Sequence, residues 1–274
     1  MRLNDLVKAI ILSTGLAASA KGFDYFTAVQ TAQPGQLQLV EGLKHADESV
    51  DKAGNKKDVD ITTAFFTPTL KLKNDRWFAS LTVPMSWIDN NTADQDAHGL
   101  GDCSFQFGPH FKLGDLYILP MLEYWTPTGS YDPSSKVNTG SGKHQIGGTL
   151  NFTRVKEHSI VDLGISHLEQ INGEKYKDTV QGAAGYKTER WILGGGFNYS
   201  FGDGGLENLS VGPLIRYTGK NNWHITACIE KDVYGRNTSQ GWNASIRFRI
   251  PLGEKQSPPR KATNYKGNAM YAKR

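Results

Sequence analysis

The sequence predicts an all-β protein, a transmembrane antiparallel up-and-down β-barrel of about twelve strands. Apolar residues recur at every second position in runs of roughly 9–11 residues, and the polar connections between the runs alternate in length. No apolar run reaches the roughly 18 residues that a membrane-spanning helix needs. The mean hydropathy of -0.47 agrees with a barrel, because lipid-facing and water-facing residues alternate along each strand.

The run from Arg76 to Trp87 shows the alternation most clearly. Its odd positions form one apolar face with tryptophan at both ends, namely Trp77, Ala79, Leu81, Val83, Met85 and Trp87. Ser80, Thr82 and Ser86 fall on the other face. Successive side chains of a strand point to opposite faces, and indole rings suit the two membrane–water interfaces. We therefore predict a lipid-facing strand here.

Later runs repeat this alternation, at 191–201, 209–217, 223–233 and 242–250. In the last of them Trp242, Ala244, Ile246 and Phe248 alternate with Asn243, Ser245, Arg247 and Arg249. The run from 178 to 186 is rich in glycine and alanine and predicts its strand least clearly. Without it, the number of strands would be odd.

The connections between the runs support the same class. Five short ones fall at 73–75, 113–115, 156–157, 187–189 and 219–221. Six longer ones fall at 45–58, 89–98, 127–142, 170–177, 202–207 and 234–240. Together they imply about twelve strands, with both ends of the barrel on the side of the short turns. We expect that side to face the periplasm.

The two ends of the chain predict segments outside the barrel. A basic start and an apolar stretch that closes on Ala18-Ser19-Ala20 indicate a signal peptide over residues 1–20. The barrel would then occupy residues 21–252. Residues 253–274 carry a charge of +5 and have little to bury, which favours a disordered periplasmic tail over a binding arm.

Charge and cysteine content exclude several classes. The net charge is +4, but residues 21–252 alone carry -2. They therefore lack the clustered basic residues that a nucleic-acid-binding protein has. Cys103 and Cys228 lie in well-separated predicted strands. Because a disulfide needs Cα atoms within about 7 Å, we expect no disulfide between them. Cys103 shares an apolar face with Phe105, whereas Cys228 would face the lumen. No CxxC or HExxH spacing occurs, so we expect neither a metal nor a cofactor.

Motifs in the third to fifth predicted strands resemble a known family. They are Gly99-Leu100-Gly101-Asp102, then Gly108-Pro109, then Pro127-Thr128-Gly129-Ser130-Tyr131-Asp132, followed by Asn138 and Gly140. They are similar to those of the outer-membrane family linked to the meta pathway of phenol degradation, over Val40 to Leu252. The resemblance implies a Gram-negative outer-membrane barrel that moves hydrophobic or aromatic compounds, and it brings no catalytic residues. Many such barrels end on an aromatic residue, whereas this chain continues into a tail.

Each of these motifs also has a simpler interpretation. The glycines of 99–102 allow positive φ where the backbone leaves a loop and begins a strand. The Gly, Ser, Asn and Pro content of 127–142 is typical of a turn-rich surface loop. A long loop can also fold inward and constrict a pore. In that case Tyr131, Asp132 and Asn138 are the candidate constriction residues.

Charged residues occupy the predicted lumen face of three successive strands, namely Arg216, Glu230, Asp232, Arg247 and Arg249. Opposite charges on neighbouring strands can lie across from one another. Such ion pairs would brace the inner wall, since buried charges are usually paired. Alternatively, a charged constriction would filter solutes. A mixed lining, to which Asp102, His110, Lys112, Glu123, Asp162 and Arg190 would contribute, argues against strong ion selectivity.

An enzyme or a soluble carrier fits less well. A lipid hydrolase needs a serine activated by a histidine, whereas the adjacent pairs His158-Ser159 and Ser166-His167 send the two side chains to opposite faces of a strand. A lipocalin-like carrier would expose outward tryptophans such as Trp77 to water.

The sequence therefore predicts a non-enzymatic outer-membrane channel or uptake protein that passes small hydrophobic or aromatic compounds by passive diffusion. A lipid-modifying enzyme, or a structural or lipid-binding barrel without transport activity, is the alternative. The expected partners are outer-membrane lipid and a small hydrophobic or aromatic solute, with no nucleic acid.

Overall fold

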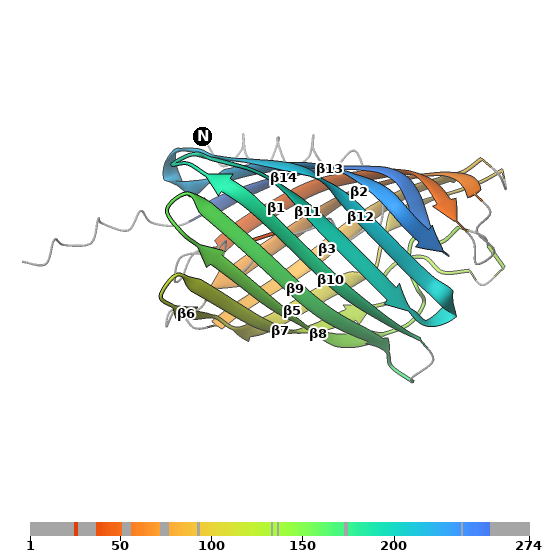
Figure 1. Ribbon diagram of the computed structural model, residues 1–274. Helices are drawn as coiled ribbons and strands as arrows, with labels where there is room; N and C mark the ends of the chain where they lie inside the picture. The colour runs from red at the N-terminus through yellow and green to blue at the C-terminus, as the bar shows by residue number, and fades with distance from the viewer. Residues whose placement is uncertain are drawn as a thin grey trace, which may run out of the picture.

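The computed structural model describes residues 25–26, 37–50, 56–71, 77–91, 94–132, 134–135, 137–172, 175–236 and 238–252. These residues form antiparallel strands that curl into a barrel and cross its long axis at an incline (Figure 1). The strands are β1 (Leu37–Val50), β2 (Lys56–Lys71), β3 (Trp77–Asn90), β4 (Gln95–Leu100), β5 (Cys103–Pro109), β6 (Phe111–Leu113), β7 (Leu116–Thr126), β8 (Gln145–Val155), β9 (Ser159–Gln170), β10 (Tyr176–Lys187), β11 (Trp191–Gly202), β12 (Leu206–Thr218), β13 (His224–Arg236) and β14 (Thr238–Leu252). Two single 3-10 turns, η2 (Asp203–Gly205) and η3 (Lys220–Asn222), lie between strands.

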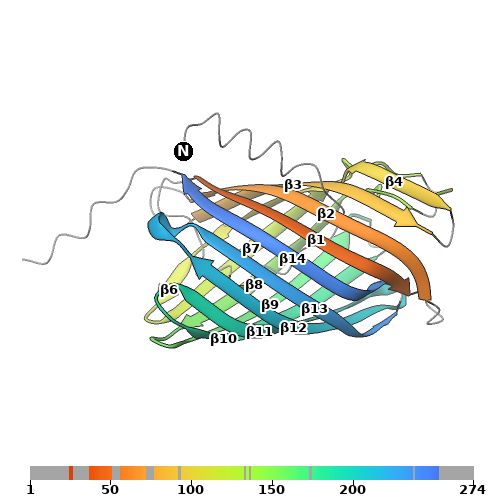
Figure 2. The same ribbon diagram turned by 90° about the horizontal axis from the view of Figure 1, so that it is seen from above.

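The barrel closes through the first and last strands. β1 pairs with β14 on one side and with β2 on the other, both antiparallel, so that Leu37 lies across from Leu252 and from Leu70. Figure 2 shows β14 and β1 side by side along the wall. Pairing then continues through β2, β3, β5 and β7 and strand by strand to β14. A closed ring leaves no unpaired strand edge to face lipid.

β4, β5 and β6 are pieces of one interrupted crossing. β4 pairs with the second half of β3, β5 pairs with the first half of β3 and also with β7, and β6 pairs with β7 alone. The interruptions fall at Gly101-Asp102 and at His110. Within the described ranges the wall thus has twelve crossings, as predicted from the alternating connections. The glycine-rich run at 178–186 is one of them, in β10.

The predicted two faces are confirmed. In β3 the Leu81 side chain is 44% exposed on the outside of the barrel, whereas Ser86 on the other face is completely buried. The apolar positions predicted in the four later runs include exposed outward residues such as Trp191, Ile215, Ile229 and Trp242. The polar positions between them face the lumen, where Ser200, Ser210 and Asn243 are buried.

The short turns are where they were predicted, but several long connections are shorter than expected. β1 runs to Val50 and β2 begins at Lys56, and only residue 237 separates β13 from β14. Backbone pairing therefore continues into polar segments, because hydrogen bonding between strands does not require an apolar face. The connection at 127–144 is longer and irregular.

The predicted signal peptide at 1–20 and the tail at 253–274 lie outside the described residues. Within the predicted barrel segment the first strand begins at Leu37. No helix among the described residues is long and apolar enough to cross a membrane.

Candidate functional site in the barrel lumen

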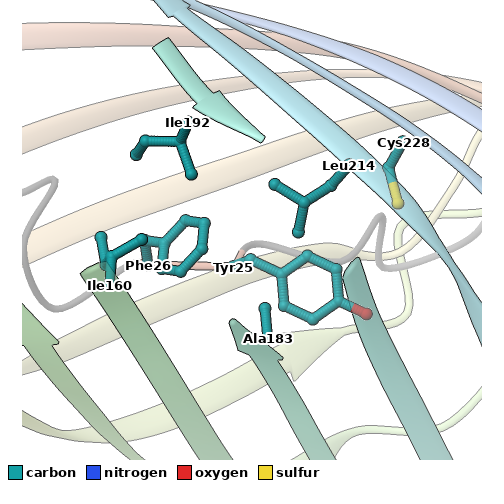
Figure 3. Close-up of a cluster of buried hydrophobic side chains, with 7 residues drawn as sticks. All are labelled: Tyr25, Phe26, Ile160, Ala183, Ile192, Leu214 and Cys228. Carbon is teal, nitrogen blue, oxygen red and sulfur yellow. The ribbon is translucent and has the colours of Figure 1, made fainter. Parts of the chain in front are cut away.

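Two aromatic residues that precede the first strand lie inside the barrel. Tyr25 is 2% exposed and Phe26 is 0% exposed. Their rings pack on one side chain from each of five neighbouring strands, β9 to β13, namely Ile160, Ala183, Ile192, Leu214 and Cys228 (Figure 3). These five residues lie on the face opposite the exposed one, so the cluster occupies the lumen. It is the inward aromatic pair, rather than a residue of the wall, that fills this part of the barrel.

The Tyr25 hydroxyl donates a hydrogen bond of 2.7 Å to Oε1 of Glu230 on β13. The Cys228 thiol donates a longer one, of 3.5 Å, to the same oxygen. Burial first, and then the charge of Glu230, raise the pKa of the Tyr25 hydroxyl above its ordinary value, so the phenol keeps its proton. Glu230 is only 1% exposed, and a buried carboxylate is stable when donors satisfy it.

Glycine at position 196 of β11 makes room for the Tyr25 ring. A Cβ atom at Gly196 would lie 2.4 Å from Cζ of Tyr25, which is closer than carbon atoms pack. Any larger residue here would displace the ring or the strand. The wall is therefore shaped to this side chain.

Arg216 on β12 holds the backbone of the same pair. Its Nη2 donates 3.2 Å to the carbonyl oxygen of Tyr25, and its Nε donates 3.2 Å to Oγ1 of Thr226. The guanidinium carbon lies 5.0 Å from the centre of the Phe26 ring, a cation–π contact. Arg216 therefore anchors Tyr25 and Phe26 through both hydrogen bonding and ring stacking.

The five charged residues predicted to line the lumen lie on the lumen face of their strands, and in the pairing of β12, β13 and β14 none of them lies directly across from a residue of opposite charge. Thr226 lies across from both Arg216 and Arg247, His224 lies across from Arg249, and Asn243 lies across from Glu230. The register therefore places the arginines nearer the short turns than the two carboxylates. Alternation alone fixes the face of a residue and not its level along the barrel.

Asp232 and Arg247 on this wall also contact neutral groups. Asp232 accepts hydrogen bonds from Nδ2 of Asn208 at 3.1 Å and from Nδ2 of Asn243 at 2.7 Å. The Arg247 guanidinium lies 5.0 Å from the Phe65 ring centre, and Gly42 of β1 lies between the two residues in the pairing. These contacts stabilise the charges against the wall.

The opposite wall adds apolar side chains to the lining. Phe78, Leu119 and Met121 form a buried cluster there. Asp102, Glu123 and Asp162 are buried as expected for lumen residues, whereas Lys112 and Arg190 are exposed near the short turns. The inner surface is thus partly apolar and partly polar.

The long loop at 127–144 is fastened to the break between β4 and β5 by Asp102. One carboxylate oxygen accepts from the Gly129 amide at 3.1 Å and the other from the Ser141 amide at 2.7 Å. Gly129 and Gly140 meet backbone to backbone, since a Cβ at Gly129 would lie 2.6 Å from Cα of Gly140. The motif residues Asp102, Gly129 and Gly140 thus form one structural unit, and positioning the loop is their role in this structure.

Two of the three candidate constriction residues, Asp132 and Asn138, are hydrogen-bonded to each other within the loop. Asn138 Oδ1 accepts from the Asp132 amide at 2.6 Å, and Asn138 Nδ2 donates to the Asp132 carbonyl oxygen at 3.1 Å. Hydrogen bonds from Ser134 hold the pKa of the Asp132 carboxyl below its ordinary value. Tyr131 is exposed.

Val137, which the sequence analysis did not single out, is a loop residue that packs on the inner wall. It is buried against Val59 of β2 and Ile88 of β3, on the lumen face of those strands. The loop therefore packs on the lumen face at the end of the barrel away from the short turns, while constriction of a pore by Tyr131, Asp132 and Asn138 stays a prediction.

Sequence reasoning also missed Tyr25, Phe26 and Gly196. The aromatic run Phe23-Asp24-Tyr25-Phe26 between the predicted cleavage site and the first strand is a signal that was available. Such a run in a segment that crosses no membrane needs a place to be buried.

Comparisons with known proteins agree on the fold. A family model described as "Putative MetA-pathway of phenol degradation" matches residues 41–248. The COG4313 outer membrane channel from Pseudomonas putida F1 is similar with a TM-score of 0.72 and 14% identity, over 85% of this chain and 100% of that one. The KdgM porin in complex with disordered oligogalacturonate is similar with a TM-score of 0.50 and 10% identity, over 79% of this chain and 99% of that one. No curated protein sequence matches this chain.

Proposed function

Because the chain belongs to the MetA-pathway phenol-degradation family and has the fold of an outer-membrane barrel, we propose that it is an outer-membrane channel for small hydrophobic or aromatic compounds. The solute would diffuse passively through the lumen. The observation that carries this proposal is the enclosure of the Tyr25 and Phe26 rings in the lumen. A lumen that buries two aromatic rings against apolar and polar side chains has the chemistry to receive an aromatic solute.

The membrane location is supported by the outer surface of the barrel. Large apolar side chains are exposed around it, including Leu122, Val161, Leu193 and Ile229. In water such a band would be a large apolar patch, whereas outer-membrane lipid would cover it. We take the short-turn side to be periplasmic, after a signal peptide has been removed.

For the charged lining we propose a bracing role. The contacts of Arg216, Asp232 and Arg247 described above run to a backbone carbonyl, to amides and to aromatic rings. Each of these contacts fixes a charge against the wall. The inward loop with Val137 would narrow the other end of the pore, while the hydrogen bonds between Asp132 and Asn138 hold the conformation of that loop.

An enzymatic function finds less support. Ser166 lies on the lumen face and His167 on the outer face of β9, where its Nδ1 lies 2.7 Å from Oδ1 of Asp178. The adjacent serine and histidine therefore cannot form a nucleophile and base pair. A structural or lipid-binding barrel remains the alternative, and transport measurements separate it from a channel.

The test is planar-bilayer conductance of the purified chain, followed by swelling of liposomes that contain it in aromatic acids and in sugars of similar size. We expect discrete conductance steps and faster swelling in the aromatic acids than protein-free liposomes show. The absence of both conductance and swelling would favour the structural or lipid-binding alternative.

A further inference from the structure

We propose that the Tyr25 side chain occupies a phenol-binding site in the barrel wall, and that a neutral phenol binds there when Tyr25 leaves. This inference rests on the proposed function and names the class of solute that the lumen recognises. The site is formed by Glu230, Cys228, Gly196, Leu214 and Ala183. Tyr25 is then an internal ligand that competes with the solute.

The site is complementary to a phenol in both of its parts. The ring lies against Leu214 and Ala183, and Figure 3 shows it between these two side chains. It occupies the space that Gly196 leaves open. The hydroxyl points at the Glu230 carboxylate 2.7 Å away. A tyrosine side chain is chemically 4-methylphenol joined to the backbone, so the wall already binds this molecule in tethered form.

The carboxylate makes the site selective for a donor. A buried acceptor that is left without its donor is costly, so a ring that lacks a hydroxyl binds much more weakly at such a site. An aromatic carboxylate would bring a second negative charge next to Glu230, which disfavours it further. We therefore expect 4-methylphenol to bind most tightly and toluene more weakly, and we expect no binding of 4-methylbenzoate.

Tethering gives Tyr25 an advantage over a free solute. A ligand that is part of the same chain as its site has an effective concentration on the order of millimolar. A free phenol must exceed that concentration to displace Tyr25, or Tyr25 must be removed. The wild type should therefore bind phenol only above a threshold concentration, and removal of the Tyr25 side chain tests the proposal directly.

The test measures 4-methylphenol binding by isothermal titration calorimetry to the full chain in detergent. We expect saturable binding of one molecule to Tyr25→Gly, binding at least tenfold weaker to the wild type, and an intermediate affinity for Tyr25→Phe, whose tethered ring lacks the hydroxyl. Adding Gly196→Ala to Tyr25→Gly should abolish binding, because the new Cβ fills the place of the ring. Gly195→Ala is the matched control, because a Cβ there lies 3.3 Å from the Gly212 oxygen, outside the site.

Equal binding to the wild type and Tyr25→Gly, or no loss on adding Gly196→Ala, would overturn the proposal, as would equal binding of toluene. If Tyr25→Gly does not give the β-sheet circular dichroism of the wild type, the comparison of Tyr25→Phe with the wild type decides instead, and equal affinities there would overturn it. The proposed channel fails separately, through absent conductance. Binding of 4-methylphenol without conductance would support the phenol site and contradict the proposed channel. Conductance without binding of 4-methylphenol would support the channel and overturn the phenol site.

Discussion

The Tyr25 hydroxyl and the Glu230 carboxylate, 205 residues apart in the chain, are joined by a hydrogen bond of 2.7 Å inside the barrel. This contact links the segment before the first strand to the inner wall. Together with the bond from Arg216 to the Tyr25 carbonyl, it holds an aromatic pair where a solute would pass.

Tyr25→Phe tests the contribution of that hydrogen bond. Removing a donor from a buried charged acceptor costs about 2 kcal/mol, so the aromatic pair should leave the lumen more often and channel openings should become more frequent. Single-channel recording measures this. The pKa of Tyr25 is raised above 10.0, so the stabilisation is fully present below pH 10.0 and opening of the wild type should not change as pH rises towards that value. Unchanged openings in Tyr25→Phe would show that the bond does not hold the pair.

Leu81→Arg tests the assignment of the two faces. Leu81 is exposed on the outside of β3, between Trp77 and Trp87, so an arginine there should destabilise the inserted barrel by about 2–4 kcal/mol. Thr82→Arg, on the lumen face, should cost less. Unfolding in urea in the presence of lipid vesicles gives both values. Equal losses for the two variants would contradict the assignment.

Asp102→Asn tests the fastening of the inward loop. The neutral amide accepts more weakly than the carboxylate and leaves the amides of Gly129 and Ser141 less well satisfied, a loss of about 1–2 kcal/mol. Hydrogen exchange of residues 127–144 should become faster. Asp115→Asn, in a short turn at the other end of β7, is the control and should leave exchange of the loop unchanged. If both variants behave alike, Asp102 is not the anchor.

Arg247→Ala separates the bracing role from the filter. The contact of Arg247 with the Phe65 ring is worth about 0.5–2 kcal/mol, so thermal stability should fall by that amount. The reversal potential across a salt gradient should stay as in the wild type. A shift of the reversal potential towards cation selectivity would mean that the arginine filters solutes.

Much of the wall was predictable from sequence because each strand must satisfy two solvents. Lipid on one face of β3 and a polar lumen on the other impose a period of two, which fixes the face of Leu81 and Ser86 without knowledge of the neighbours. The same reasoning placed Arg216 and Glu230 on the inside. Cross-strand partners depend instead on register, which is why Thr226, and not a carboxylate, lies across from Arg216 and Arg247.

The contents of the lumen were less predictable. Tyr25 and Phe26 lie in no strand, so no periodicity marks where they go, and their partners are more than a hundred residues away in the chain. Val137 is the one aliphatic residue between positions 127 and 144, and it is buried in a loop that Asp102 also contacts through a hydrogen bond. Such contacts arise from tertiary packing, which local pattern does not encode.

The central claim is that an aromatic pair occupies the path of the solute, and the most direct test is single-channel conductance of Tyr25→Ala/Phe26→Ala in planar bilayers. The account predicts a larger and more persistent conductance than the wild type has, because two buried rings no longer fill the lumen. Tyr186→Ala, which removes an exposed ring from the outer face, should conduct as the wild type does. Conductance of the double variant equal to that of the wild type, in barrels with the same β-sheet circular dichroism, would contradict the claim.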